Sequence, residues 1–330
     1  MQRGWPGDEA LPSGAGLRSV LKHPYPFDPG YGYSLADLLA IQAPPPPDDF
    51  AEYWRERHDR VCSCDPRPVL RRTGDHGAWH VYDLSYQSAD GLTLGGWVLS
   101  PRFHAPRRLW VIGHGYGGRD EPDWDWPRQD SVLVFPCARG MGRSRQAGLP
   151  EDPARHVLHG IEDRDSYLIG HCVDDLWLAI HAARQLFPHQ PWIGYAGISF
   201  GGGLGALACP WEPLVQGVHL NMPTFGHWPL RLICPTVGSG ASVRAYVHEA
   251  GHVPETLSYY DASSAAAFAD VPLFSALALF DPAVAPPGQF AIHNAWAGDK
   301  VFIPLQAGHF ESPCHDEETR RIHELLRTWF

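Results

Sequence analysis

Short apolar runs and longer segments with helical spacing alternate along most of the chain after residue 44. Continuous apolar runs at residues 109–112 and 132–135 are typical of strands that are buried on both faces of a sheet. Residues 174–187 instead repeat their apolar positions with the period of a helix. Further strands are predicted at residues 80–100 (strand, turn and strand), 192–196, 215–222, 271–280 and 301–305.

Strands that alternate with helices predict the α/β class, with a mainly parallel sheet covered by helices on both faces. Residues 44–330 contain no internal repeat and no sign of a second core, so we expect one domain. Residues 1–43 are rich in Gly, Pro and polar residues and are interpreted as an N-terminal arm. Between about residues 224 and 268 the periodicity loosens, which suggests a cap-like insertion over a site.

The amino-acid composition excludes some classes of binding partner. The formal net charge of -11 argues against nucleic acid, whose binding depends on clustered Lys and Arg. Neither a signal-peptide core near the start nor a run long enough to span a membrane is found in the sequence. The seven cysteines follow no disulfide or zinc-site spacing, so reduced thiols and a cytoplasmic location are expected.

The most specific chemical signal is a glycine-flanked serine that follows the apolar run 192–196. In the sequence Gly-Ile-Ser-Phe-Gly, residues 197–201, the glycines allow a sharp strand-to-helix turn that exposes the Ser199 hydroxyl. This arrangement predicts a nucleophile at Ser199. The alternative interpretation of the motif alone is an ordinary glycine-rich turn.

A serine nucleophile needs a histidine as base and an acid to orient that histidine. Asp281 follows the predicted strand 271–280, and His309 follows the predicted strand 301–305. Both come after the serine in the order that α/β hydrolases use, and we expect their strands to neighbour the serine strand. The rivals Asp270 and Asp299 precede their strands, and His293 falls in a predicted helix.

An oxyanion that forms during attack needs preorganised donors. The backbone N–H of Phe200, directly after the nucleophile, is one candidate. The second candidate is the N–H of Tyr116, because the sequence His-Gly-Tyr-Gly-Gly at residues 114–118 follows an early predicted strand.

A competing motif points to zinc chemistry. His248, Glu249 and His252 match the His-Glu-x-x-His pattern of zinc peptidases. Gly251 and Pro254 weaken the helix that this chemistry requires. We therefore expect no metal ion and no cofactor in catalysis.

Several passages together resemble one esterase family. They are residues 47–54, 82–91, 114–119, 139–140, 160–163, 197–203 and 256–261. In this order they are similar to the acetyl xylan esterase and cephalosporin-C deacetylase family, carbohydrate esterase family seven. The resemblance runs from about residue 44 to the end.

The resemblance implies an α/β-hydrolase fold and a serine esterase that removes acetyl groups from small acetylated sugars or related esters. It places the triad on Ser199, Asp281 and His309, the oxyanion hole on the Tyr116 and Phe200 amides, and Pro223 near the acetyl pocket. It also implies a homo-oligomer, because such esterases often assemble as hexamers.

Several positions depart from the family pattern, and two of them bear on the expected pocket. Phe200 and Met141 stand where glutamines are usual, so we expect a more apolar pocket. This difference leaves open a first alternative to acetyl ester hydrolysis, a related hydrolase for another acyl ester. A second alternative, of another class, is a non-catalytic binding protein on a hydrolase scaffold.

Overall fold

The computed structural model describes residues 21–330, and one mixed sheet of nine strands organises this part of the chain. The strands are β1 (Val69–His76), β2 (Trp79–Gln87), β3 (Thr93–Pro101), β4 (Arg108–Gly113), β5 (Ser131–Pro136), β6 (Ile193–Ile198), β7 (Val218–Asn221), β8 (Leu273–Ala278) and β9 (Lys300–Leu305).

The strand order is β1-β2-β3-β5-β4-β6-β7-β8-β9. The pairs from β1 to β5 are antiparallel, and all pairs from β5 through β4 to β9 are parallel. The predicted mainly parallel α/β sheet is therefore confirmed. Its parallel strands all end at one edge, where the loops that carry the candidate residues begin.

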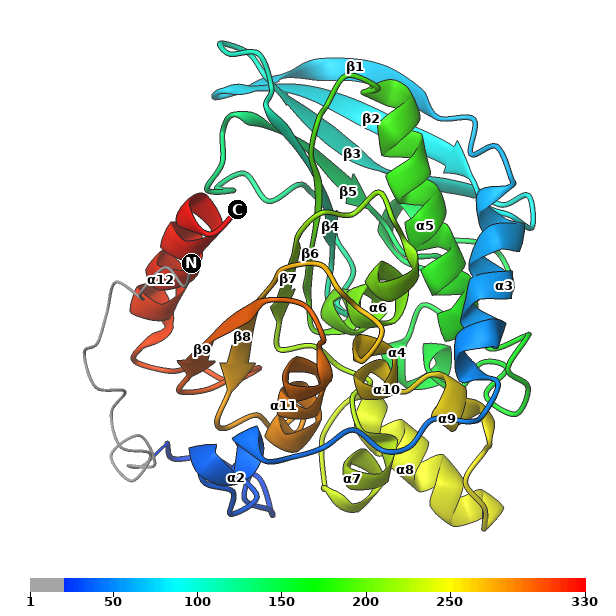
Figure 1. Ribbon diagram of the computed structural model, residues 1–330, viewed down its shortest axis with the longest axis vertical. Coiled ribbons are helices and arrows are strands. Elements are labelled where there is room, and N and C mark those ends of the chain that lie inside the picture. The colour runs from blue at the N-terminus through cyan, green and yellow to red at the C-terminus, as the bar shows by residue number, and fades with distance from the viewer. Residues whose placement is uncertain (1–20) are drawn as a thin grey trace.

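Helices lie on both faces of the sheet (Figure 1). The longer ones are α3 (Phe50–Cys62), α5 (Leu168–Leu186), α6 (Phe200–Ala208), α8 (Ser239–Ala250), α11 (Pro286–Ala295) and α12 (His315–Thr328). The shorter ones are α2 (Leu35–Leu39), α4 (Pro153–His156), α7 (Trp228–Ile233), α9 (Thr256–Tyr259) and α10 (Ala262–Ala266), with 3-10 turns η1 (Gly142–Ser144) and η2 (Cys209–Trp211).

Two large apolar clusters fill the spaces between sheet and helices. One joins α3, α5 and α6 to the sheet and includes the buried rings of Trp54 and Trp177. The other contains Trp110 and packs beneath α12 through Ile322 and Leu326. Fully burying an apolar side chain contributes about 1.5–3 kcal/mol, so these faces fix the sheet between its helices.

The pattern of apolar residues did not predict strand β1 or the helices within residues 224–268. Strand β1 is almost entirely exposed and carries Arg71, Arg72 and Asp75, so it has no apolar pattern to reveal it. It forms the outer edge of the sheet, where charged residues are common. Residues 224–268 contain the longer helix α8 and the short helices α7, α9 and α10, and Pro and Gly interrupt the segments on both sides of α8.

The described part of the N-terminal arm, residues 21–43, packs against the domain. Leu38 of α2 is buried with Leu277 and Phe290. The Asn294 side chain donates to the carbonyl groups of Leu38 and Ile41, both at 2.9 Å. The first 20 residues of the predicted arm lie outside the described residues.

None of the helices within residues 21–330 combines the length and apolar character needed to cross a bilayer.

Candidate active site

Ser199 sits on a strained turn between β6 and α6. Its backbone angles are φ 53 and ψ -109, in the left-handed half of the map that residues with a Cβ rarely adopt. A Cβ on Gly197 would lie 2.5 Å from backbone atoms of Gly201, and one on Gly201 would lie 2.7 Å from the Gly113 carbonyl carbon. Glycine is therefore required on both sides of the serine. The turn leaves the Ser199 hydroxyl free to face the edge of the sheet.

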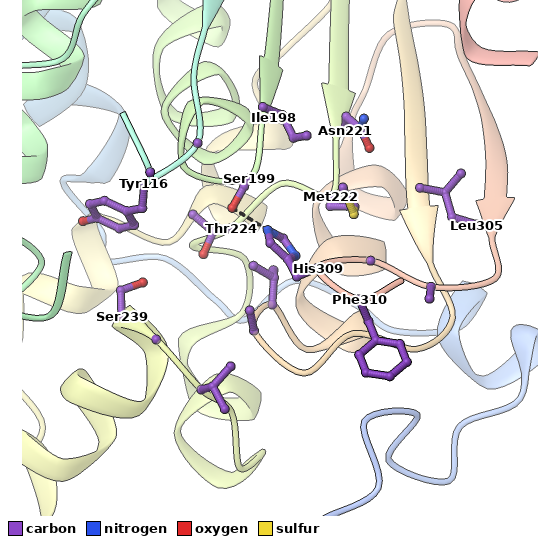
Figure 2. Close-up of a pocket in the computed structure, with 18 of the residues that line it drawn as sticks. Tyr116, Ile198, Ser199, Asn221, Met222, Thr224, Ser239, Leu305, His309 and Phe310 are labelled. Atoms are coloured by element: carbon purple, nitrogen blue, oxygen red, sulfur yellow. Dashed lines mark hydrogen bonds between the residues drawn. The ribbon is translucent and has the colours of Figure 1, made fainter. Parts of the chain in front are cut away.

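A chain of hydrogen bonds joins the predicted serine, histidine and aspartate. His309 Nε2 lies 2.8 Å from Ser199 Oγ, and His309 Nδ1 lies 2.8 Å from Asp281 Oδ2. Figure 2 shows the first of these bonds across the cavity. Because one ring nitrogen faces the acid and the other faces the hydroxyl, the imidazole can receive a proton from the serine.

The Asp281 carboxylate is buried and fully supplied with donors. Oδ1 accepts the backbone N–H groups of Ala283 and Val284, both at 2.9 Å. Oδ2 accepts the Gln289 side chain at 2.9 Å, and the Asp281 side chain is 0% exposed. These bonds hold the carboxylate in one orientation beside His309.

The N-terminal arm also contacts the loop that carries Asp281. The Asp281 backbone N–H donates to the carbonyl group of Pro29 at 3.1 Å, and a Cβ on Gly30 would lie 3.6 Å from the Leu279 carbonyl oxygen. The described arm therefore packs directly beneath the loop that carries the carboxylate.

The environment of His309 makes its imidazole a stronger base. Burial alone would lower the pKa of His309, but the negative charge of Asp281 and the hydrogen bond to it outweigh burial and raise that pKa. The side chain is 25% exposed, so it is open to the cavity where a substrate would bind.

The strands of the three residues are not all neighbours, contrary to the sequence-based expectation. β6, which carries the serine turn, pairs with β4 and β7, while β8 and β9 lie beyond β7. The loops after β8 and β9 close the gap, and His309 adopts φ 46 at the point of closest approach. A Cβ on the preceding Gly308 would lie 2.4 Å from Asp281 Oδ2, so glycine is required here too.

The two predicted oxyanion donors lie on either side of the serine. Phe200 is the first residue of α6, so its N–H has no acceptor within the helix. The Gly118 N–H donates to the Gly115 carbonyl at 3.0 Å and so forms a turn. The N–H of Tyr116, within this turn, takes no part in that hydrogen bond. A Cβ on Gly115 would lie 3.7 Å from Ser199 Cβ, which places this turn against the serine.

His114 holds the turn in place, a role that the sequence did not reveal. The Ala138 N–H donates to His114 Nε2 at 3.0 Å, so Nδ1 carries the proton and donates to the Gly115 carbonyl at 2.6 Å. The His114 carbonyl accepts the Gly201 N–H at 2.9 Å, which ties the turn to α6. Burial lowers the pKa of His114 to about 4, so this imidazole stays neutral near pH 7.

Phe200 and Met141 do not form the wall of the substrate cavity. Both side chains are buried, at 0% and 4% exposure. The Phe200 ring stacks on the Tyr116 ring with centroids 4.1 Å apart and meets His156 edge-on. The expected apolar change of the pocket is therefore not found at these two positions, because their side chains point into the core behind the turn.

The cavity at Ser199 has a volume of about 570 Å³, within the usual range for small-molecule sites. Apolar side chains from three loops surround the serine, among them Met222, Val237 and Val284. Figure 2 shows Met222 and Thr224 close to Ser199 and His309. Pro223 lies between these two residues in the sequence and is buried. It packs against α6, because a Cβ on Gly202 would lie 2.9 Å from the Pro223 Cα.

The competing histidines are occupied elsewhere. Helix α8 ends at Ala250 and Gly251 is left-handed, so His252 is not on the helix that carries His248. His252 Nε2 instead bonds Glu162 at 3.1 Å. His293 lies in α11 with Nδ1 3.2 Å from Ser275 Oγ. Within residues 21–330, the side chains that could share a metal ion belong to a different group, which is described below.

Comparison with known proteins identifies the family. The sequence matches the model of the acetyl xylan esterase family over residues 41–319. The chain belongs to this family. As an acetyl xylan esterase family member it is a carboxylic ester hydrolase. A comparison with curated protein sequences finds no match.

Solved structures agree with the family in fold. The acetyl xylan esterase from Paenibacillus sp. R4 is 23% identical, with a TM-score of 0.76, over 88% of this chain and 99% of that chain. Acetyl xylan esterase 1 from Thermoanaerobacterium sp. JW/SL YS485 is 21% identical, with a TM-score of 0.75, over 91% and 99%. The acylaminoacyl peptidase of Pyrococcus horikoshii is 15% identical, with a TM-score of 0.57, over 77% and 42%. The fold shared with these esterases and peptidases is that of the α/β hydrolases.

Proposed function

We propose that this esterase removes acetyl groups from small acetylated sugars or related esters, with Ser199, His309 and Asp281 as its catalytic triad. The observation that carries the proposal is the pair of 2.8 Å contacts that runs from Ser199 Oγ through both nitrogens of His309 to Asp281. Family membership supports the choice of an acetyl ester as substrate.

In the first step His309 Nε2 takes the hydroxyl proton while Ser199 Oγ attacks the ester carbonyl carbon. The carbonyl electron pair moves to oxygen, where the Phe200 and Tyr116 amides stabilise the negative charge. The tetrahedral intermediate then releases the alcohol, which takes the proton from His309. The acetyl group remains on Ser199 as an ester.

The second step repeats the first with water. His309 takes a proton from the water molecule while its oxygen attacks the acetyl-enzyme. Acetic acid leaves and the proton returns to Ser199. Asp281 keeps Nδ1 protonated and stabilises the imidazolium that forms in both steps. The chemistry of these residues is complete without a cofactor.

The cavity suits a short acyl group. Met222, Thr224 and Val284 line the cavity together with Ser199. Because Met222 and Thr224 flank Pro223 in the sequence, we keep Pro223 as a predicted residue of the acetyl pocket. Residues 224–268 would act as a cap, because they supply Thr224, Val237 and Ser239 to the lining. The predicted division into an arm at 1–43 and a domain at 44–330 also remains part of the proposal.

Cellular location and assembly are also part of the proposal. All seven cysteines are free thiols, which fits a reducing compartment such as the cytoplasm. A homo-oligomer, with a hexamer as the form that the resemblance suggests, can be checked by light scattering after size-exclusion chromatography.

The substrate is tested by kcat/KM on p-nitrophenyl esters of increasing acyl length, together with acetylated xylose and cephalosporin C. An acetylesterase should lose activity steeply beyond two or three carbons. A maximum at longer or aromatic acyl groups would instead identify a hydrolase for another ester. Failure of a fluorophosphonate probe to label Ser199 would favour a non-catalytic binding protein.

A further inference from the structure

A second cluster of reactive side chains lies away from the cavity, where α3 and α5 pack together (Figure 1). It contains His58 and Cys62 of α3, His181 of α5 and Glu212, the residue that follows η2. One possible ligand atom from each residue lies within 4.8 Å of all the others. None of the four residues lines the cavity at Ser199.

The local structure aims these side chains at one point. His58 and Cys62 are four residues apart and share one face of α3. His58 Nε2 lies 3.3 Å and His181 Nε2 lies 3.1 Å from the same atom, Glu212 Oε2. The other carboxylate oxygen, Oε1, accepts the Leu214 N–H at 3.0 Å, which fixes the orientation of the Glu212 side chain.

These spacings fit a tetrahedral metal ion. Zinc bonds of about 2.0–2.3 Å to nitrogen, oxygen and sulfur put neighbouring ligand atoms roughly 3.3–3.7 Å apart. The two nitrogen-to-oxygen distances of 3.3 and 3.1 Å are already close to that range. The remaining ligand atoms need to approach by about 1 Å, which side-chain rotation can supply.

The charge of the cluster also favours a cation. The Glu212 side chain is 0% exposed, and within residues 21–330 its ion-pair partners are the two histidines, with neither Lys nor Arg among them. A buried carboxylate is costly unless positive charge balances it. A divalent ion bound by one carboxylate and one thiolate gives a neutral site. The other ring nitrogen of His58, Nδ1, lies 3.6 Å from the exposed Asp59 carboxylate, which adds negative charge near the cluster.

We propose that His58, Cys62, His181 and Glu212 bind one zinc ion that holds α3, α5 and the segment after α6 together. Four protein ligands leave no open position for a substrate, so the ion is structural rather than catalytic. Access is available through His181, whose side chain is 25% exposed. The proposal is independent of the triad at Ser199.

Cobalt(II) provides a direct test, because a thiolate bound to tetrahedral cobalt gives a charge-transfer absorption that zinc removes. The full chain, stripped with a chelator and dialysed, should bind one cobalt per chain, show this absorption and lose it on addition of one equivalent of zinc. Zinc should also raise the Tm of the stripped protein, because it binds the folded form.

Variants locate the site. Cys62→Ser should abolish the charge-transfer absorption, and His181→Gln should weaken zinc binding by at least about tenfold, the loss that even an outer-shell change can cause. Cys64→Ser is the matched control, since Cys64 lies two residues after Cys62, beyond the end of α3, and outside the cluster. It should bind metal like the unaltered protein, and all three variants should still hydrolyse p-nitrophenyl acetate.

A further measurement uses the unaltered chain, so its result does not depend on whether a variant folds. Zinc should slow alkylation of Cys62 by iodoacetamide, followed by mass spectrometry of its peptide, and should not slow alkylation of Cys64. Absence of binding at micromolar zinc, equal binding by Cys62→Ser and Cys64→Ser, or unprotected Cys62 would each overturn the proposal. His58, His181 and Glu212 would then form only a hydrogen-bonded network beside Cys62.

Discussion

The Phe200 ring lies flat against the Tyr116 ring, with centroids 4.1 Å apart and an interplanar angle of 19°. The backbone amides of these same two residues are the proposed oxyanion donors. The stacked pair therefore couples the turn after β4 to the start of α6, the two segments that carry the proposed donors. The glutamine that the family resemblance led us to expect at this position would not form such a stack.

Phe200→Leu should weaken this coupling while it keeps the core apolar. An aromatic pair is worth about 0.5–1.5 kcal/mol beyond its buried area, so kcat for p-nitrophenyl acetate should fall roughly two- to tenfold with little change in KM. Phe274→Leu, at another fully buried phenylalanine, is the control for general loss of stability. Equal kcat values for Phe200→Leu and the unaltered enzyme would show that the stack does not position the donors.

Gln289 should support both the stability and the activity of the enzyme through Asp281. Its Nε2 donates to Asp281 Oδ2 at 2.9 Å and to the Val284 carbonyl at 2.7 Å, while its Oε1 accepts the Ala278 N–H at 2.9 Å. Gln289→Leu removes these three bonds and deprives the buried Ala278 N–H and Val284 carbonyl of their Gln289 partner, at a cost of about 1–3 kcal/mol in the free energy of unfolding.

Urea denaturation and kcat measured on the same Gln289→Leu preparation check this prediction. We expect kcat to fall as well, because the Asp281 carboxylate gains freedom to rotate. Gln146→Leu, which removes an exposed hydrogen bond to Thr93, should change neither quantity appreciably. An unchanged kcat in Gln289→Leu would mean that the backbone donors alone orient the acid.

His114→Phe should reduce kcat while it leaves KM nearly unchanged. The substitution removes the acceptor of the Ala138 N–H and the donor to Gly115, and so loosens the turn that carries the Tyr116 amide. Complete loss of one oxyanion donor costs about 2.7–4 kcal/mol in the transition state, which sets the upper limit of the effect. His114→Gln keeps an acceptor and should recover part of the activity. Similar kcat values for both variants would contradict this positioning role.

The sequence predicted the buried strands because their apolar runs are continuous, and it predicted Ser199, Asp281 and His309 because each follows such a strand. Strand β1 was missed because its side chains are exposed and charged. Gln289 and His114 were missed because they act through neighbouring groups, and no spacing marks a buried polar residue within an apolar segment. The direction of the Phe200 ring was likewise inaccessible, since it depends on the packing of Tyr116 and His156.

The cluster around Glu212 could not be predicted from the sequence either. His58 and Cys62 are close in sequence, but His181 and Glu212 come from distant segments that only the packing of α3 on α5 brings together. The zinc motif that is visible in the sequence, at His248 and His252, is instead split by the end of α8.

The pH dependence of kcat/KM should report the charge on His309. Protonated His309 cannot accept the serine proton, so activity is lost as the pH falls through its pKa. Because Asp281 raises this pKa, the acid limb of the unaltered enzyme should have its midpoint above 6.5, the ordinary pKa of histidine. Asp281→Asn removes the raising influence and leaves burial, so its midpoint should move to lower pH.

The same Asp281→Asn variant should lose about 10⁴-fold in kcat, because the asparagine amide favours the wrong tautomer of the imidazole. His114 should not contribute to the acid limb near neutral pH, since its pKa lies at about 4. An acid limb with the same midpoint in Asp281→Asn and the unaltered enzyme would show that Asp281 does not raise the pKa of His309.

The most direct test of the triad is kcat/KM for p-nitrophenyl acetate in Ser199→Ala, measured beside Ser242→Ala, a serine of α8 whose hydroxyl bonds to Gly238. Removal of a triad serine elsewhere lowers kcat by about 10⁶-fold, so Ser199→Ala should retain no more than trace activity. Ser242→Ala should match the unaltered enzyme. Hydrolysis by Ser199→Ala at the rate of the unaltered enzyme would contradict the assignment of Ser199 as the nucleophile.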